Sequence, residues 1–360
     1  MKLGPPISDS LPWIRHVLDL QEARSIGAPG PRIEALRAAG RRLGDSLREG
    51  PQVVGVKTLN NVTLPYPTRF AFNGAVPLPW PFVTMVHRTL LVELLTEAGP
   101  KKLLFNPSDA AAARSTPFFT KLAERIESVA PFAEKLLSSK FESITDQLAR
   151  LGIAPEDIDV IAFDHFHTQD LRPLLGTETA AARFPNAVLL APRLEWNHWD
   201  GLHPMQRPWF IEDGKTGVPE ERVILIDHDL CLGHGCLLVG TPGHTVGNQT
   251  LFVHSDDGVF GCSENGCSAD NWSPRYSGIP GLKKFVDWYE VETVLNSNTP
   301  ELGGEQYASM ILERSVVDTV AERPEFVQMF PSSEVTPSPL APGVQPAMLF
   351  GHRDGGRFAH

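Results

Sequence analysis

Three short apolar runs in this chain are each followed by residues that can bind a metal ion. The runs and the residues after them are 158–163 with His165 and His167, 236–240 with His244, and 259–262 with Glu264. Short apolar runs bounded by turn residues are typical of buried strands. Because strand ends bring polar groups to one edge of a sheet, the pattern predicts a β-rich fold with a site at that edge.

The spacing of the histidines suits a single metal ion. His165 and His167 are two residues apart on a non-helical turn, so both rings can face one ion, and neutral imidazoles bind zinc and iron alike. A pair of this kind equally fits surface or core histidines. Pro242 and Gly243 predict a tight turn that holds His244 at a strand end as a third imidazole. Glu264 is the candidate fourth ligand.

Composition narrows the class of protein. The chain has 360 residues, with 32 basic and 43 acidic side chains and a net charge of −11, which argues against nucleic acid or anionic lipid as a partner. No apolar run approaches the roughly 20 residues that span a bilayer, and the N-terminus lacks the apolar stretch of a signal peptide. Four cysteines do not form a disulfide framework in so long a chain. We therefore expect a cytoplasmic protein without a membrane partner.

Changes in residue pattern and composition along the chain divide it into three parts. Residues 1–50 predict a helical extension, with helices at 11–22 and 31–48 separated by a turn rich in glycine and proline. Residues 51–330 predict the main domain, which begins with short β-rich runs and has a helical pattern at 114–151. Residues 331–360 are rich in proline and glycine and predict an extended tail.

The order of these motifs resembles the metallo-β-lactamase superfamily, and especially its lactonase-like hydrolases, over roughly residues 55–300. The similar segments are LGIAPEDIDVIAFDHFHTQD, FPNAVLLAPRLEW, TPGHTVGNQTLFV and DDGVFGCSENG. The resemblance implies an α/β (α+β) chain folded as a four-layer αββα sandwich, with its metal site at one edge of the two sheets. Residues 1–50 and 331–360 lie outside it and are candidates for homodimer contacts or a lid.

The resemblance also implies a ligand set, from which this chain partly departs. His165, His167 and His244 match the family's first metal site. At the second site Gln169 and Asp170 stand where the family has Asp and His, Glu264 replaces the bridging Asp, and Asn298 replaces a His. An oxygen-only second site suits iron, manganese or magnesium better than zinc. A carboxylate moved by one residue also points to the other side of an extended segment. We expect one divalent ion, zinc or iron with manganese as an alternative, although the carboxylate count allows two.

These residues predict a metal-dependent hydrolase of a small-molecule ester, lactone or related substrate. A divalent ion at the three histidines would acidify a water molecule. Gln169 cannot act as a base, so Asp170 or Glu264 must accept the proton. Two alternatives remain open: a non-haem iron oxygenase, because histidines and a carboxylate also hold mononuclear iron, and an inactive member of the superfamily that binds a ligand.

Further residues are candidates for the surroundings of the metal. Asp164 can fix an imidazole tautomer or cap its loop. The long irregular stretch at 192–222 either roofs a substrate pocket or packs on itself. Arg275 either meets an anionic group of the substrate or is solvated. The pocket candidates are Trp196, Trp199, His203, Trp209 and Arg275.

Overall fold

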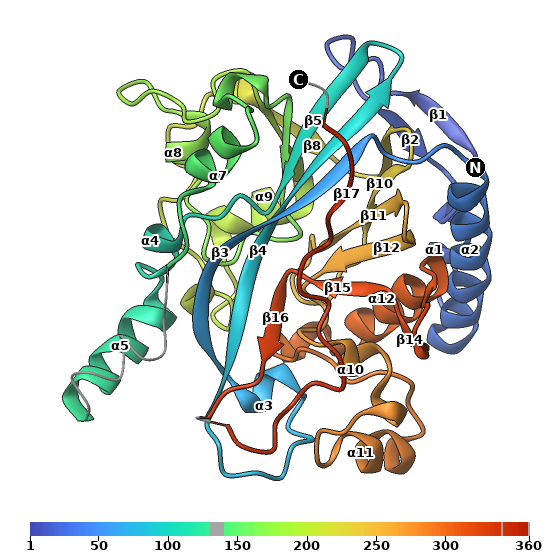
Figure 1. The fold of residues 1–360 in the computed structure, drawn as a ribbon, viewed down its shortest axis with the longest axis vertical. Coiled ribbons are helices and arrows are strands. Elements are labelled where there is room, and N and C mark those ends of the chain that lie inside the picture. The colour runs from blue at the N-terminus through green and yellow to red at the C-terminus, as the bar shows by residue number, and fades with distance from the viewer. Residues whose placement is uncertain (130–139, 340, 359–360) are drawn as a thin grey trace.

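The computed structural model describes residues 1–129, 140–339 and 341–358, and in these parts the chain forms two large β-sheets with helices on their outer faces (Figure 1). The strands of the seven-stranded sheet are, in spatial order, β1 (Leu3–Pro6), β2 (Arg15–Val17), β9 (Asp229–Gly233), β10 (Cys236–Gly240), β11 (Gln249–Ser255), β12 (Gly258–Ser263) and β15 (Met329–Pro331). The eight-stranded sheet has the order β17 (Gly355–Gly356), β3 (Gly55–Pro67), β4 (Phe82–Thr96), β5 (Gly99–Phe105), β6 (Val160–Ala162), β7 (Val188–Pro192) and β8 (Val223–Ile226), with β16 (Ser333–Thr336) also paired to β4. A separate pair consists of β13 (Thr319–Val320) and β14 (Arg323–Val327).

Helices connect and cover these strands. The α-helices are α1 (Gln21–Arg24), α2 (Pro29–Glu49), α3 (Thr68–Ala71), α4 (Ala110–Ala113), α5 (Pro117–Val129), α7 (Ile144–Arg150), α8 (Arg172–Leu175), α9 (Arg193–His198), α10 (Ala269–Trp272), α11 (Leu282–Tyr289) and α12 (Gly303–Val316). The short 3₁₀ helices are η1 (Pro155–Asp157), η2 (Trp199–Gly201), η3 (Arg207–Trp209), η4 (Glu220–Arg222), η5 (Pro274–Tyr276) and η6 (Pro300–Leu302). Among the described residues, no helix is both long enough and apolar enough to cross a bilayer.

Side-chain alternation along the strands shows how the sheets face each other. In β5, Leu103 and Phe105 join the core between the sheets, whereas Leu104 joins the core on the outer face. In β10, Leu238 faces the same central core and Leu237 faces the opposite side. Because successive strand residues point to opposite faces, each sheet is apolar on both sides and needs a helical layer outside it.

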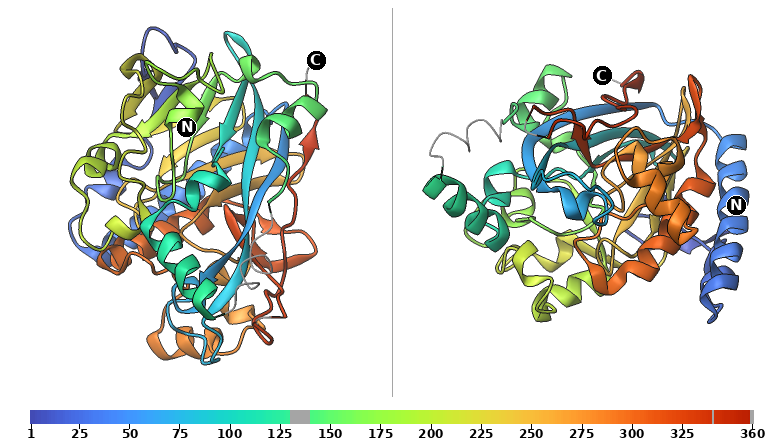
Figure 2. Two further views of the ribbon diagram at one scale, coloured as in Figure 1. Left: turned by 90° about the vertical axis from the view of Figure 1, so that its left-hand side faces the viewer. Right: turned by 90° about the horizontal axis from the view of Figure 1, so that it is seen from below.

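The outer helices complete four layers. Leu148 of α7 packs in the core outside the eight-stranded sheet, and α2 and α12 cover the seven-stranded sheet (Figure 2). The helices α2 and α12 are so close that a Cβ atom added at Gly44 would lie 2.2 Å from the carbonyl oxygen of Val316. The chain is therefore an αββα sandwich, which confirms the predicted fold class.

The structure corrects the predicted helix at 11–22. That segment contains β2, in which His16 pairs with Leu230 of β9 at the edge of the seven-stranded sheet, and only Gln21–Arg24 is helical beyond it. Pairing with a strand more than 200 residues away overrides the local helix pattern. The predicted helix at 31–48 lies within α2. The helical pattern at 114–151 corresponds to α5 and α7, and its residues 130–139 lie outside the described residues.

The C-terminal residues add strands to the eight-stranded sheet. Glu334 in β16 forms a buried ion pair with Arg88 in β4, with 2.6 Å between its carboxylate and the guanidinium. Further along, β17 pairs with β3. The tail therefore runs along this sheet, as its red trace beside β3 and β4 shows in Figure 1.

Candidate metal centre

Loops from both sheets bring three histidines together. His165 and His167 follow β6 of the eight-stranded sheet, and His244 lies between β10 and β11 of the seven-stranded sheet. The backbone N–H of Gln249 donates to the carbonyl of Asp164 at 2.7 Å, and the Gln249 amide donates to the carbonyl of Phe163 at 3.0 Å. These bonds join the start of β11 to the end of β6, so the two loops are held at one edge of the sandwich.

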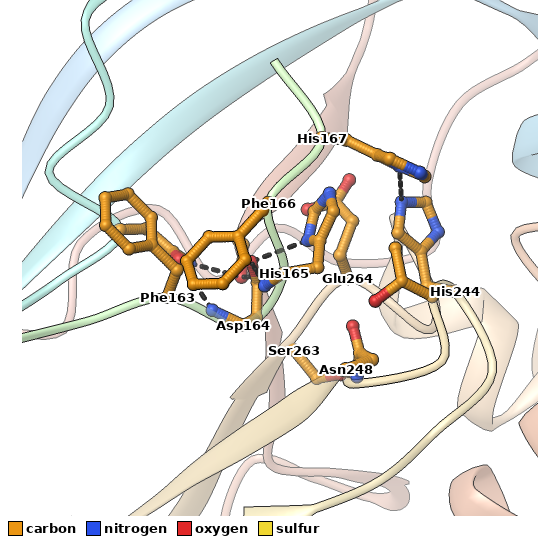
Figure 3. A network of polar contacts seen from close by, with 12 residues as sticks. Phe163, Asp164, His165, Phe166, His167, His244, Asn248, Ser263 and Glu264 are labelled. Atoms are coloured by element: carbon orange, nitrogen blue, oxygen red, sulfur yellow. Dashed lines mark hydrogen bonds and ion pairs between the residues drawn. The ribbon is translucent and has the colours of Figure 1, made fainter. Parts of the chain in front are cut away.

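The three imidazoles are close enough to bind one ion. One ring nitrogen from each of His165, His167 and His244 lies within 4.8 Å of the others. Nδ1 of His167 and Nε2 of His244 are 3.3 Å apart. All three residues are at most 9% exposed, and Figure 3 shows their rings gathered at one place. We call this group the histidine cluster.

The environment keeps two of the three imidazoles neutral. Burial and the nearby charge of His165 lower the pKa of His167 and of His244 well below the ordinary value. Burial also opposes protonation of His165, but the carboxylate of Asp164, 2.7 Å from its Nδ1, outweighs burial and raises its pKa. Neutral imidazole is the form that binds a metal ion.

Glu264 lines the same pocket as the histidine cluster, although its carboxylate is outside the group of nitrogens within 4.8 Å. Burial, followed by the negative charge of Asp164, raises its pKa to about 8. The side chain is 4% exposed, and its Oε2 has no hydrogen-bond partner. A buried carboxylate oxygen without a partner costs free energy unless something else satisfies it.

The other residues of the implied second site differ in placement. Gln169 lines the pocket, and its amide donates to Ser108 Oγ at 2.8 Å. Asn298 also lines the pocket, and its Oδ1 lies 3.2 Å from Thr299 Oγ1.

Asp170 is directed elsewhere. Both of its carboxylate oxygens accept from the guanidinium of Arg172 at 2.8 Å, and the residue does not line the pocket. This placement agrees with the geometric expectation that a carboxylate shifted by one residue is redirected. Asp170 is therefore paired with Arg172 outside the pocket, where its carboxylate does not face the histidine cluster.

The three tryptophan candidates in the 192–222 loop also differ in whether they line the pocket. Trp209 lines the pocket. Trp199 is 4% exposed and packs on Phe166, with its indole N–H donating to the carbonyl of Ile211 at 2.9 Å. Trp196 packs under the ammonium of Lys215. Neither Trp196 nor Trp199 lines this pocket, because both rings are used in packing the loop itself.

The last two pocket candidates are at the surface. The side chain of His203 is 57% exposed, and its nearest carboxylate partner is Glu301 at 3.9 Å. Arg275 is 54% exposed and pairs with Asp287 at 2.6 Å. Neither residue lines the pocket. Of the two alternatives for Arg275, contact with the substrate or solvation, the structure shows solvation.

Sequence reasoning missed several residues that hold the cluster. The Oε1 atom of Glu195 accepts from the N–H of Phe166 at 2.6 Å, and its Oε2 accepts from Thr245 Oγ1 and from the N–H of Gly247. One buried carboxylate thus joins the loop of His165 and His167 to the loop of His244. Glu195 lies near the end of the segment FPNAVLLAPRLEW, and its position after β7 at the same sheet edge is a usable signal.

Two further polar residues near the cluster were also missed. Gln206 contacts His167, with 2.7 Å between Gln206 Oε1 and His167 Nε2. His87 lines the pocket between Ser108 and Ser333, at 3.0 Å from each hydroxyl, and burial lowers its pKa to about 4. His87 is on β4, far from the histidines in sequence. It reaches the site because it pairs with Ser333 of β16.

The donor set fits a divalent metal ion. Three buried imidazoles converge, two of them kept neutral by their surroundings, and a carboxylate oxygen without a partner lines the same pocket. Nitrogen-rich sites with one carboxylate suit zinc, iron and related transition metals.

No family model matches the chain. Similar solved structures include a dizinc quorum-quenching lactonase bound to a product, at 14% identity over 85% of this chain and 95% of that chain with a TM-score of 0.48. A hydrolase of the β-lactamase superfamily is similar at 13% identity over 86% of this chain and 99% of that chain, with a TM-score of 0.45. A probable metal-dependent hydrolase from Staphylococcus aureus is similar at 13% identity over 72% of this chain and 82% of that chain, with a TM-score of 0.48.

Likeness at these identities and scores carries no function over to this chain. Its own sheet order, helical layers and histidine loops define an αββα sandwich with a three-imidazole site at the sheet edge. This four-layer architecture is the one that the sequence resemblance to the metallo-β-lactamase superfamily implied.

Proposed function

We propose that the protein is a metal-dependent hydrolase that acts on a small-molecule ester or lactone. The observation that carries this proposal is the convergence of ring nitrogens from His165, His167 and His244 within 4.8 Å at a pocket. A divalent ion bound there would supply Lewis acidity to a substrate carbonyl and to a water molecule. We infer one ion, because Asp170 is paired with Arg172 and the described residues offer no second cluster of metal-binding side chains.

Glu264 is the residue proposed to accept the proton in hydrolysis. The amide of Gln169 cannot accept a proton and donates to Ser108. The carboxylate of Asp164 is engaged by His165 and Ser332. Glu264 lines the pocket, and burial raises its pKa to about 8, so it can exchange a proton near neutral pH.

The pocket and its neighbourhood favour a substrate with an apolar arm. The pocket walls include Leu64, Tyr66, Met85, Phe119 and Trp209. The ring of Trp209 stacks on Phe118 at 4.2 Å between centroids.

Phe118 lines a neighbouring cavity of about 580 Å³, which is large enough for the apolar part of a small molecule. Phe70, Trp80, Phe82 and Leu122 are also among its lining residues. We propose that this cavity holds the acyl or alkyl arm while the carbonyl group lies at the histidine cluster.

A panel of esters and lactones with short and long acyl chains tests the proposal on protein loaded with zinc, iron or manganese. We expect hydrolysis with a kcat/KM that rises with chain length. Trp209→Ala should weaken that preference, because it removes the ring that lines the pocket and stacks on Phe118 of the cavity. Trp288→Ala is the matched control, since Trp288 is 79% exposed on α11. Absence of hydrolysis across the metals and the panel would contradict the proposal.

The same preparations separate the two alternatives. Oxygen consumption by the iron-loaded protein would indicate an oxygenase. Ligand binding that persists after removal of the metal, without turnover, would indicate a binding protein. Both remain predictions.

A further inference from the structure

A short chain of polar contacts leads from the histidine cluster to η6. The Oε1 atom of Gln206 lies 2.7 Å from Nε2 of His167, and the Nε2 atom of Gln206 donates to Oε1 of Glu301 at 2.8 Å. Gln206 is 9% exposed. Its backbone is also fixed, because its N–H donates to the carbonyl of His203 at 2.8 Å and its carbonyl accepts from the N–H of Trp209 at 3.0 Å.

The partners of Gln206 determine which way its amide points. An ionised carboxylate only accepts hydrogen bonds, so the NH₂ group of Gln206 must face Glu301. The amide oxygen then faces His167, and an oxygen acceptor requires an N–H on His167 Nε2. A neutral imidazole has only one N–H, so the lone pair on Nδ1 of His167 is left free.

That free nitrogen is the one that faces the cluster. Nδ1 of His167 is 3.3 Å from Nε2 of His244. At His165 the arrangement is reversed, because Asp164 accepts from Nδ1 and leaves Nε2 free. Each of these two histidines therefore has its inward nitrogen selected by a partner on its other side.

We propose that Gln206 and Glu301 are positioning residues that fix His167 in the Nε2–H tautomer and so make its Nδ1 the metal-binding atom. The inference rests on the proposed metal site. It gives the 192–222 loop a role at the metal in addition to the pocket wall formed by Trp209.

The position of Glu301 links this contact to the third histidine. Glu301 lies in η6, two residues after Thr299, whose hydroxyl donates to the carbonyl of His244 at 2.5 Å. Residues 299–301 therefore contact the His244 loop directly and His167 through Gln206. A change at Glu301 should act on His167 through the orientation of the Gln206 amide.

The first test measures the tautomer in the metal-free protein by long-range ¹H–¹⁵N correlation of the histidine side chains. The wild type should show His167 as the Nε2–H tautomer. Gln206→Leu should show a mixture of tautomers, and Glu301→Gln should give an intermediate result because the Gln206 amide can then turn either way. An unchanged His167 tautomer in Gln206→Leu would overturn the proposal.

The second test measures zinc affinity by competition with a chelator, with thermal unfolding of the metal-free proteins as a check on folding. Gln206→Leu should bind zinc about 10- to 100-fold more weakly than the wild type, as losses of such partners typically do. Gln52→Leu is the matched control, because the Gln52 amide donates to the carbonyl of Ser255, away from the cluster. Equal zinc affinity in Gln206→Leu and the wild type would also overturn the proposal.

The two measurements keep this inference separate from the proposed function. If the wild type binds no zinc, the metal site fails. The tautomer in the metal-free protein then still decides whether Gln206 controls His167.

Discussion

The carboxylate of Asp164 accepts a hydrogen bond from Nδ1 of His165 at 2.7 Å, while its second oxygen accepts from the hydroxyl of Ser332 near the start of the C-terminal tail. This contact leaves Nε2 of His165 as the nitrogen available to a metal ion. It also joins the tail to the metal site, because Ser332 lies between β15 and β16.

Asp164→Asn should weaken metal binding about 10- to 100-fold, because the neutral amide no longer favours the His165 tautomer as strongly. Chelator competition with zinc measures the change. Asp159→Asn is the matched control: Asp159 precedes β6 at its other end and pairs with Lys101 at 2.8 Å. Equal losses of affinity in the two variants would show that general destabilisation, and not the bond to His165, is responsible.

Glu195→Ala should destabilise the protein by about 3 kcal/mol, because it leaves the buried N–H of Phe166 and the partly buried N–H of Gly247 without an acceptor. Glu195→Gln should cost less, since its amide oxygen still accepts one bond. Urea unfolding of the metal-free proteins gives both values. The exposed Glu221→Ala control should stay within about 0.5 kcal/mol of the wild type. If Glu195→Ala lost as little stability as the control, the hydrogen bonds of Glu195 would not be what joins the two histidine loops.

Glu264 predicts a distinctive pH dependence for the metal-free protein. Its pKa rises from an ordinary 4.5 to about 8 in the folded state, first through burial and then through the charge of Asp164. The folded state therefore binds this proton more tightly than the unfolded state, so stability falls as the pH rises through that interval. Glu264→Gln removes the titrating carboxyl group and should remove this part of the decrease in stability.

The check is the difference in Tm between wild type and Glu264→Gln across the same pH interval. The wild type should lose stability relative to the variant as the pH rises. A difference that stays constant with pH would show that Glu264 does not hold its proton in the folded state.

Much of the site could be predicted because its residues follow local signals. His165, His167 and His244 each come directly after an apolar run, and sequence spacing alone places them at strand ends. These positions depend on neighbours along the chain, which a sequence displays directly. The four-layer sandwich was implied by the resemblance of the same motifs to the metallo-β-lactamase superfamily.

The rest depends on contacts between distant residues. The segment around His16 looks helical but pairs with β9, and Trp199 looks like a pocket residue but packs on Phe166. Glu195 and Gln206 show no metal-binding pattern of their own, and each gains its role only when its loop folds back on the histidines. Periodicity and spacing do not determine how such loops fold.

The most direct test of the metal site is the metal content of protein purified without added metal or chelator, measured by elemental analysis on wild type and His165→Ala. We predict about one divalent ion per chain in the wild type, as three imidazoles and one carboxylate would hold, and its loss in His165→Ala. Wild-type protein that binds no metal even after reconstitution would contradict the account. Full retention of the ion by His165→Ala would contradict it equally.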